Sequence, residues 1–407
     1  MTGFSRPRAS ALGVVCAVLL SGCSSGVLGS GSTVTVVIGV DGPLTGKLAD
    51  LGLGIRNSAE LAIAKANAKN VVPGVKFVLD AKDDEADEQK AKSNGDAFAA
   101  DGRVMGVVGP LTSSGAILMA PVMAQAGLAE VSPSNTAPGL TWGADYRANG
   151  KKRQYPTYFR TVTTDAVQGP LLARYAHSRL KAGRAAVISD TKAYGSNLAA
   201  EFATAFEEVG GKVVYRTTVK PGTTDFSKIA QLVAAQDPDI VYYGGEHPEG
   251  GPLGAALKAA GVKVPLAAAT ACTPTASSRP PARPPTGTSP ASRASPSRAS
   301  PRPSATSTPT ARLSYKEEPG PFGAYGYDST WAVIQAVAKA RQSNEDLTGP
   351  ELRKATADAL QNVSFFGVTG DVSFDEFGDT HNQVASIYKV QKGAWTSIVP
   401  FGRLRDF

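Results

Sequence analysis

The stretch VMGVVGPLTSSGAILMAPVMAQAG (Val104–Gly127) places two kinds of sequence pattern next to each other. Val104–Pro110 is apolar throughout, which predicts a strand that is buried on both faces. The residues from Ser113 onward carry apolar side chains at helical spacing and predict a helix. A buried strand, a short loop and a helix form the repeating unit of a parallel α/β sheet.

The same alternation continues on both sides of this stretch. Thr33–Val40 predicts a strand and Ile55–Lys69 a helix, and a second series of strands and helices starts after Tyr155–Val162. We therefore predict the α/β class, with two similar lobes, each a mainly parallel sheet flanked by helices, joined by a hinge of crossing segments. Near the C-terminus, helices are expected at Ser329–Arg341 and Pro350–Asn362, and strands near Val368–Phe374 and Ser386–Val390.

The N-terminus has the pattern of an export signal. Arg6 and Arg8 precede the apolar run Ala11–Leu20, which is too short to span a membrane and predicts a signal peptide over residues 1–22. The following LSGC (Leu20–Cys23) resembles a bacterial lipobox, so we expect Cys23 to be lipidated. Residues 23–32 then form a flexible Gly/Ser tether. The alternative is an ordinary signal peptide with an incidental cysteine; in either case we expect an extracytoplasmic protein, anchored to the cell membrane if Cys23 is lipidated.

The formal net charge of +7 comes from two segments that contain no acidic residue. Residues 1–22 and 267–314 together hold eight arginines, and without them the remaining chain has a formal charge of −1. A basic chain would favour a nucleic-acid or anionic-membrane partner. Because the charge lies outside the patterned sequence, we predict no nucleic-acid partner.

Residues 267–312 contain only Ala, Thr, Cys, Pro, Ser, Arg and Gly. The codons of these seven types have C or G in the middle position, whereas the twelve types with A or T there are absent. In a GC-rich gene, a shifted reading frame produces this alphabet, so we favour a double frameshift. The alternative is a disordered Pro/Ser/Thr-rich stalk. A stalk has no reason to exclude every acid, and it would interrupt a lobe where long structureless loops are uncommon.

The residues that support catalysis are missing. The three histidines have no cysteine partner or GxSxG serine, and GPLTGKL (Gly42–Leu48) lacks the spacing of a phosphate loop. The acidic run Asp83–Glu88 is typical of a solvated strand end and helix start. Cys16 and Cys272 offer neither a disulfide framework nor zinc spacing. We predict no enzyme, no metal and no cofactor; a membrane-anchored enzyme is the less favoured alternative.

Several polar side chains follow predicted strands. Ser113 opens a helix, where hydroxyl and free N–H groups can bind a carboxylate, although a simple N-cap is the alternative. Ser134 and Thr136 lie in the next such loop, where ordinary turn chemistry is the alternative. Tyr194 and Glu246 follow strands of the second series. Ligands of open α/β sheets bind at the carboxyl ends of strands, so these residues are candidate ligand contacts.

A set of motifs resembles the branched-chain amino acid-binding proteins, which are type I periplasmic substrate-binding proteins of ABC importers. The resemblance covers about Thr33–Leu266 and Pro319–Phe407. It implies a monomer that closes around a zwitterionic amino acid, expected to be branched-chain, and delivers it to an ABC permease. Rival functions are a receptor of the same fold for another small amino acid or amide, and a sugar- or nucleotide-responsive regulator. The motifs are GPLTG, VVGPLTSS, SPSNTAP, FRTVTTDAVQGP, DTKAYG, TDFS, VYYGGEHPEGG and GAYGYDSTWA.

The resemblance also implies roles for individual residues. In the family, side chains at the positions of Ser113 and Thr136, with a backbone contact at Ser134, hold the ligand's α-carboxylate. A tyrosine at the position of Tyr194 closes over the ligand. Glu246 stands here where the family has an aromatic residue.

Further positions follow from the same resemblance. Tyr327 and Asp328, in the motif GAYGYDSTWA, are also predicted to bind the ligand. The family's first-loop aromatic falls near Leu51, and its ammonium-binding acid aligns with Thr270. The implied division assigns residues 33–160 and about 313–380 to lobe I, and residues 161–266 and about 381–407 to lobe II.

Overall fold

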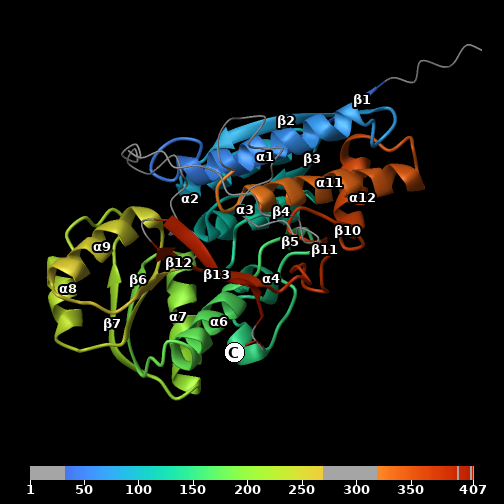
Figure 1. Cartoon of the computed structure of the whole chain (residues 1–407). Coiled ribbons are helices and arrows are strands. Elements are labelled where there is room, and N and C mark those ends of the chain that lie inside the picture. Colours follow the sequence, from blue (N-terminus) through green and yellow to red (C-terminus); the bar gives the residue numbers. More distant parts are fainter. Residues whose placement is uncertain (1–32, 269–318, 392–393, 404–405, 407) are drawn as a thin grey trace, which may run out of the picture.

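The computed structural model of the chain describes residues 33–268, 319–391, 394–403 and 406. It consists of two lobes, each built on a parallel sheet with helices on both faces, as the sequence predicts (Figure 1). The signal peptide, Cys23 and its tether, Thr270, and all but the first two residues of the stretch 267–312 lie outside the described residues.

Lobe I is built on a five-stranded parallel sheet with the order β2-β1-β3-β4-β5. The interior strand β1 is apolar because both of its faces are covered. Its Val37 packs with the side chains under one layer of helices, and Val36 and Ile38 pack under the other. The strands are β1 (Val34–Gly42), β2 (Val75–Asp83), β3 (Val104–Val108), β4 (Ala129–Ser132) and β5 (Tyr158–Arg160).

Two layers of helices enclose this sheet. On one face, Phe98 of α2 and Met119 of α3 pack against Val37, and Gly39 is needed because a Cβ there would lie 2.9 Å from the ring of Phe98. On the other face, α1, α11 and α12 bury Ile55 and other apolar side chains. The helices are α1 (Ala49–Ala68), α2 (Glu88–Ala100), α3 (Ser113–Gln125), α11 (Gly323–Ser343) and α12 (Gly349–Leu360), with the short α4 (Gly139–Trp142) and α5 (Tyr146–Asn149) before β5.

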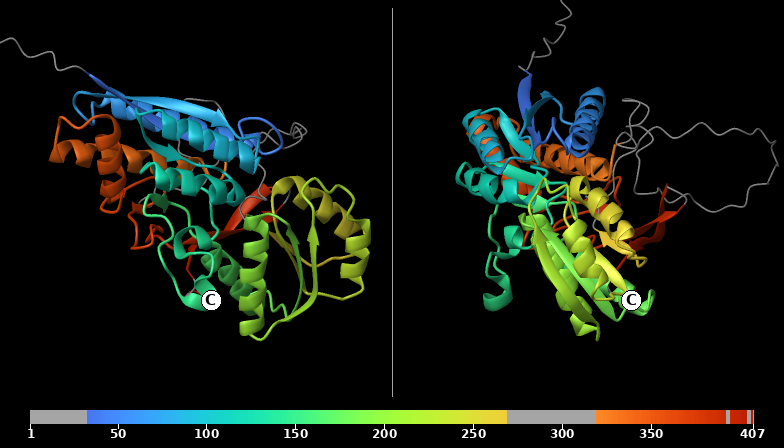
Figure 2. Two further views of the ribbon diagram at one scale, coloured as in Figure 1. Left: turned by 180° about the vertical axis from the view of Figure 1, so that it is seen from behind. Right: turned by 90° about the vertical axis from the view of Figure 1, so that its left-hand side faces the viewer.

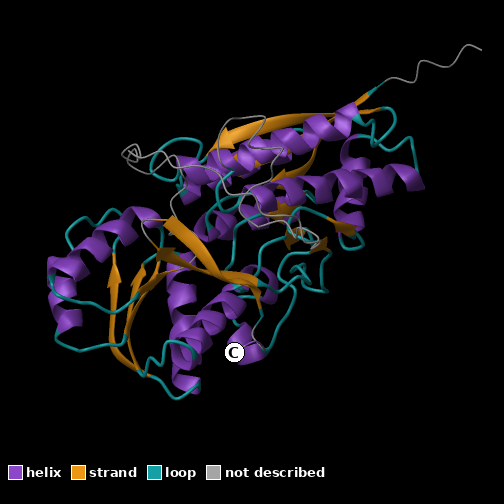
Figure 3. Ribbon diagram, viewed as in Figure 1, coloured by secondary structure: helices purple, strands orange, loops and turns teal. Residues whose placement is uncertain are grey.

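Lobe II is built on a four-stranded parallel sheet with the order β7-β6-β8-β9. Helices α6 and α7 cover one face and α8 and α9 the other, as the purple helices around the orange strands show in Figure 3. Ala267 and Ala268, the first two residues of the seven-type stretch, belong to β9. The elements are β6 (Arg184–Asp190), β7 (Lys212–Val219), β8 (Ile240–Gly244), β9 (Leu266–Ala268), α6 (Asp165–Ser178), α7 (Ala193–Glu208), α8 (Ser227–Ala234) and α9 (His247–Ala259).

Two described segments connect the lobes. The chain passes from β5 into α6 through residues 161–164, and after residue 380 it reaches the antiparallel hairpin of β12 (Ala385–Gln391) and β13 (Ala394–Gly402). Strand β12 lies against α6, and the red hairpin is seen between the lobes in both views of Figure 2. Thr163 Oγ1 donates a hydrogen bond of 2.8 Å to Gln383 Oε1, which joins the two crossing segments.

The helices and strands expected near the C-terminus form, with some differences. Helix α11 begins at Gly323, earlier than predicted, because the small residues of its first turns fit closely against α1: a Cβ on Gly326 would lie 3.1 Å from Ile55. The strand expected at residues 368–374 is reduced to β11 (Asp371–Val372), paired with β10 (Phe365–Phe366). The backbone N–H groups of Val368 and Thr369, at the start of the expected strand, instead donate hydrogen bonds to the buried carboxylate of Asp328.

Candidate functional site

The carboxyl ends of the strands in the two lobes face each other across the boundary between them. The helices α3 and α7 start there, and the N–H of Ala193 donates a hydrogen bond of 3.3 Å to Ser114 Oγ. Farther out, the hydroxyl of Tyr146 donates a bond of 2.8 Å to Glu201 on α7. The two lobes are therefore in direct contact around the strand ends.

Ser113 and Thr136 occupy the lobe I side of this boundary, and both side chains are buried. Helix α3 is capped by Thr112, whose Oγ1 accepts from the N–H of Gly115 at 3.1 Å, so Ser113 is not the N-cap. Within the described residues, neither Ser113 Oγ nor Thr136 Oγ1 forms a hydrogen bond. The Thr136 hydroxyl lies close enough to Asp165 to lower the pKa of that carboxyl. Ser113 Oγ, and Thr136 Oγ1 beside Asp165, therefore remain for a polar group from outside the chain.

The loops that carry these hydroxyls are tied together by Asn135. Its Nδ2 donates to the carbonyl oxygens of Pro110 and Leu111, both at 2.9 Å. Ser134 takes part in the same tie, because its Oγ donates to Leu111 O at 2.9 Å and its N–H donates to Ser132 Oγ at 3.2 Å. The Ser134 amide predicted to contact a ligand is thus bonded within its own loop.

Arg160 holds the far side of that loop. Its guanidinium is buried, donates from Nε to Asp379 Oδ1 at 2.6 Å, and donates from Nη1 to the carbonyls of Asn135 at 2.9 Å and Ala137 at 3.0 Å. Nη2 also donates to the hydroxyl of Thr141. A buried guanidinium with four bonds fixes the backbone on both sides of Thr136. Arg160 was not among the predicted site residues; a charged residue at the end of a short apolar strand was the available signal.

Asp165 is a second residue that the sequence analysis did not select. It opens α6, its N–H donates to Thr136 O at 2.9 Å, and its side chain is buried. Burial raises the pKa of its carboxyl to about 7, and the Thr136 hydroxyl and the charge of Arg160 oppose this rise. A carboxyl that can change charge near neutral pH therefore lies next to the loop of Thr136.

On the lobe II side, Tyr194 and Glu246 are both buried near the boundary. Glu246 precedes α9, and its Oε2 lies 3.3 Å from Lys192 Nζ. Burial raises the pKa of Glu246, and the Lys192 charge opposes the rise. The pKa of the neighbouring Asp190 is raised to about 7, mainly by burial and then by the charge of Glu246.

Both lobes line a cavity of about 210 Å³ that contains Glu246. Its lining is strongly charged, and Lys47 forms no ion pair with any residue in the described part of the chain. Lobe I contributes Lys47, Leu48, Glu85 and Ala86, and lobe II contributes Lys192, Pro221, Gly222, Glu246, Pro248 and Glu249.

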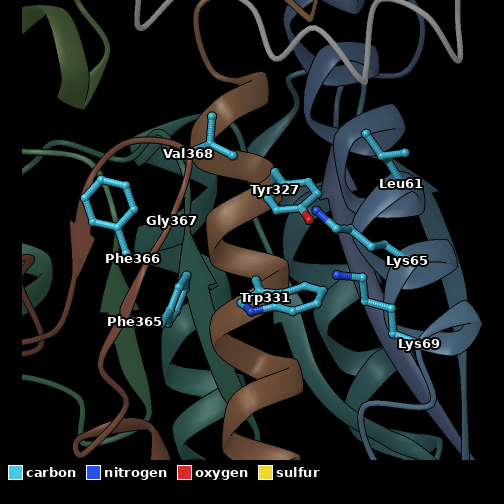
Figure 4. Close-up of a pocket in the computed structure, with 9 residues that line it drawn as sticks. All are labelled: Leu61, Lys65, Lys69, Tyr327, Trp331, Phe365, Phe366, Gly367 and Val368. Carbon is cyan, nitrogen blue, oxygen red and sulfur yellow. The ribbon is translucent and has the colours of Figure 1, made fainter. Parts of the chain in front are cut away.

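Tyr327 and Asp328 are not brought to this boundary. The carboxylate of Asp328 accepts bonds from the N–H groups of Val368 at 2.8 Å and Thr369 at 2.7 Å, and from the Thr369 hydroxyl at 2.7 Å. Asp328 thereby holds the segment between β10 and β11. Tyr327 lines a separate pocket between α1 and α11 (Figure 4). The structure gives both residues positions that do not support their predicted role as ligand contacts.

Among the described residues, no group of three or more His, Cys, Asp or Glu side chains could hold a metal ion. In the same part of the chain, no helix has both the length and the apolar character needed to cross a membrane.

Comparison with known sequences gives one family match that covers most of the chain. The family described as "Periplasmic binding protein" matches residues 35–394. A Leu/Ile/Val-binding protein of Rhizobium johnstonii is 35% identical over 218 residues, which are 54% of this chain and 56% of that protein. A Leu/Ile/Val-binding protein homolog of Brucella abortus is 29% identical over 368 residues, 90% of this chain and 93% of the relative. The match to the first of these relatives therefore spans little more than half of its length.

Solved structures share the fold at lower sequence identity. A leucine-binding protein of Thermotoga maritima superimposes with a TM-score of 0.72 and 21% identity, covering 89% of this chain and 97% of that one. A branched-chain amino acid transporter substrate-binding protein of Streptococcus pneumoniae, in complex with isoleucine, gives 0.69 and 23%, covering 90% and 100%. These neighbours confirm the two-lobe fold.

Proposed function

Because the chain belongs to the periplasmic binding protein family, we propose that it captures a small amino acid between its lobes and delivers it to an ABC importer. A solved relative is named as a substrate-binding protein of a transporter, and curated relatives are named as Leu/Ile/Val-binding proteins. The chain's part in transport would be capture and presentation, with no covalent chemistry.

The observation that carries this proposal is the pair of buried hydroxyls, Ser113 Oγ and Thr136 Oγ1. Ser113 lies in the first turn of α3, where unpaired N–H groups and the helix dipole favour an anion. A ligand carboxylate placed there would accept bonds from both hydroxyls. Each bond to a charged group contributes about 1.5–3 kcal/mol to binding.

Closure of the lobes would complete the site. The bond between Ala193 N–H and Ser114 Oγ joins the first turns of α7 and α3, and it can form only when the lobes are close. Tyr194 follows Ala193 directly, so closure would bring its ring over a ligand held by Ser113. A ligand that binds both lobes stabilises the closed state by its difference in affinity for the two states.

The names of the relatives favour leucine, isoleucine or valine as the ligand. A second candidate is a small polar amino acid or amide whose side chain would extend from Ser113 and Thr136 into the charged cavity, which neither of these residues lines. Lys47, Glu246 and Glu249 line it, and an aliphatic side chain would remove water from these groups without replacing their hydrogen bonds. A polar side chain would replace those bonds.

We also propose that the protein acts as a monomer outside the cytoplasm, held at the membrane by lipid on Cys23. The motif LSGC and the Gly/Ser residues after it support this placement. The tether would let the lobes reach a permease in the same membrane.

The test is isothermal calorimetry of the secreted part of the chain with leucine, valine, glutamine and acetamide. The chain as written and a version with the reading frame of residues 267–312 restored are both measured. Leucine methyl ester, which lacks the free carboxylate, is the matched control ligand and should bind at least about tenfold more weakly than leucine. If neither version binds any of the four compounds, the proposal is wrong.

A further inference from the structure

We propose that the outer face of lobe I carries a second binding site, for a small aromatic carboxylate, separate from the boundary between the lobes. The site is a pocket of about 310 Å³ between α1, α11 and residues 365–368. It lies toward the C-terminal end of α1, whereas the strand ends that face lobe II lie beside the start of that helix (Figure 1).

The floor of the pocket is aromatic. Tyr327 and Trp331 lie one turn apart on α11, and their rings are nearly parallel, with 6.0 Å between centroids and an interplanar angle of 7°. Phe365 and Phe366 also line the pocket, and Phe366 is 79% exposed. A flat apolar group seated among these side chains would cover aromatic surface that otherwise faces water.

The rim of the pocket is positively charged. Figure 4 shows Lys65 and Lys69 reaching from α1 toward Tyr327 and Trp331, and Lys65 Nζ lies 5.6 Å from the centroid of the Tyr327 ring. No carboxylate lines the pocket. Among the described residues, the ion pair on α1 joins Arg56 to Glu60 and leaves both lysines without an acid. An anionic group is therefore the complement that the pocket lacks.

The wall of the pocket is held in place before any ligand arrives. The buried carboxylate of Asp328 binds the backbone N–H groups of Val368 and Thr369, next to the lining residues. A wall fixed in this way does not have to be ordered by the ligand, which lowers the entropic cost of binding. The combination of flat apolar walls and two ammonium groups selects a planar ring that carries one carboxylate.

The experiment measures 1-naphthoate binding to the chain as written, by calorimetry and by the change in tryptophan fluorescence. The frame-restored chain is measured alongside it, because the stretch 267–312 is expected to limit folding of the chain as written. We expect 1-naphthoate to bind and 1-naphthamide, its neutral counterpart, to bind roughly tenfold more weakly or worse. The double variant Lys65→Gln/Lys69→Gln should lose the same factor, while Lys76→Gln, an exposed lysine on β2, should bind like the parent.

Saturating leucine separates this site from the interlobe site. We expect 1-naphthoate affinity to be unchanged by leucine. The proposal is overturned if 1-naphthoate does not bind at millimolar concentration, if the amide binds equally well, if the double lysine variant is unaffected, or if leucine displaces the probe. A chain that binds 1-naphthoate but no amino acid would keep this site and remove the function proposed above.

Discussion

Arg160 and Asp379 form an ion pair whose side chains are 0% and 1% exposed, with 2.6 Å between Nε and Oδ1. The pair joins the last strand of lobe I to the segment that leads into the second crossing. Because the same guanidinium binds the carbonyls of Asn135 and Ala137, one side chain connects the hinge to the loop of Thr136. Because Arg160 links the hinge to this loop, we expect both the stability of the protein and its ligand binding to depend on the Arg160–Asp379 pair.

Removal of one partner should destabilise the protein strongly. Asp379→Asn leaves a buried guanidinium without its anion, which costs about 3–5 kcal/mol. Urea denaturation followed by circular dichroism measures this loss. The control is Asp96→Asn, which removes an exposed ion pair to Lys92 and should change stability by less than about 1 kcal/mol. Equal losses in the free energy of unfolding for the two variants would show that the buried pair stabilises the protein no more than the exposed one.

Loss of a hydroxyl at the proposed carboxylate site should weaken ligand binding. Ser113→Ala or Thr136→Ala should reduce affinity about tenfold or more, because each removes a hydrogen bond to a charged group. Calorimetry on the frame-restored chain measures the change. Ser93→Ala, on the exposed surface of α2, is the matched control and should bind as the parent does. Unchanged affinity in both site variants would place the carboxylate elsewhere.

The stability of the protein should fall as pH rises toward neutrality. Burial raises the folded-state pKa of Asp165 to about 7, above its unfolded value of about 4, so the folded state binds more protons between these values. Stability from this group is present at acid pH and is lost as pH rises through that window. Asp165→Asn should flatten the dependence.

Denaturant titrations at pH 5, 6, 7 and 8 measure this slope. Asp101→Asn is the control, because the hydrogen bonds and charge of Arg103 lower the pKa of Asp101 to about 2 and leave nothing to titrate in this range. A parent protein and an Asp165→Asn variant with identical pH profiles would exclude Asp165 as a source of the dependence.

Lipidation depends on one cysteine. Cys23→Ala should release the protein from the membrane fraction or leave the precursor unprocessed, because the acceptor thiol is lost. Fractionation and electrophoretic mobility report the two outcomes. Cys16→Ala, inside the predicted signal peptide, should behave like the parent. Full membrane retention of the Cys23 variant with normal mobility would argue against a lipid anchor.

The stretch 267–312 should limit both folding and binding. It displaces the position aligned with the family's ammonium-binding acid, Thr270, and a buried charge without its partner costs roughly 2–5 kcal/mol. We expect the chain as written to bind its amino acid at least about thirtyfold more weakly than a frame-restored chain. Thermal melting and calorimetry of both versions test this. Equal melting and equal affinity would make the stretch a tolerated insertion.

The fold could be predicted because its signals are local. Alternating apolar strands and amphipathic helices are readable within single segments, and α11 and α12 appear near their predicted ranges. Ser113 and Thr136 were likewise selected as candidates from their places after strands, and the structure buries both side chains. The sequence did not predict which hydroxyl caps helix α3, because Thr112 and Ser113 are chemically similar neighbours and only the backbone geometry separates them.

The missed residues depend on contacts between distant parts of the sequence. Arg160 acquires its partner, Asp379, only when the chain returns from lobe II, and no short pattern contains both residues. Asp328 was placed in the site because it lies in a family motif, yet the fold turns its carboxylate toward Thr369. Proximity in a motif does not give the direction of a side chain.

The hydrogen bond between Thr163 and Gln383 ties together the two described strands of chain that cross between the lobes. Two chain segments that are joined to each other bend easily across their common plane, but they resist shear and twist. The lobes should therefore rotate about a single hinge axis and not about several. Under the function proposed above, opening would then follow essentially one angle, which a permease in contact with both lobes could sense.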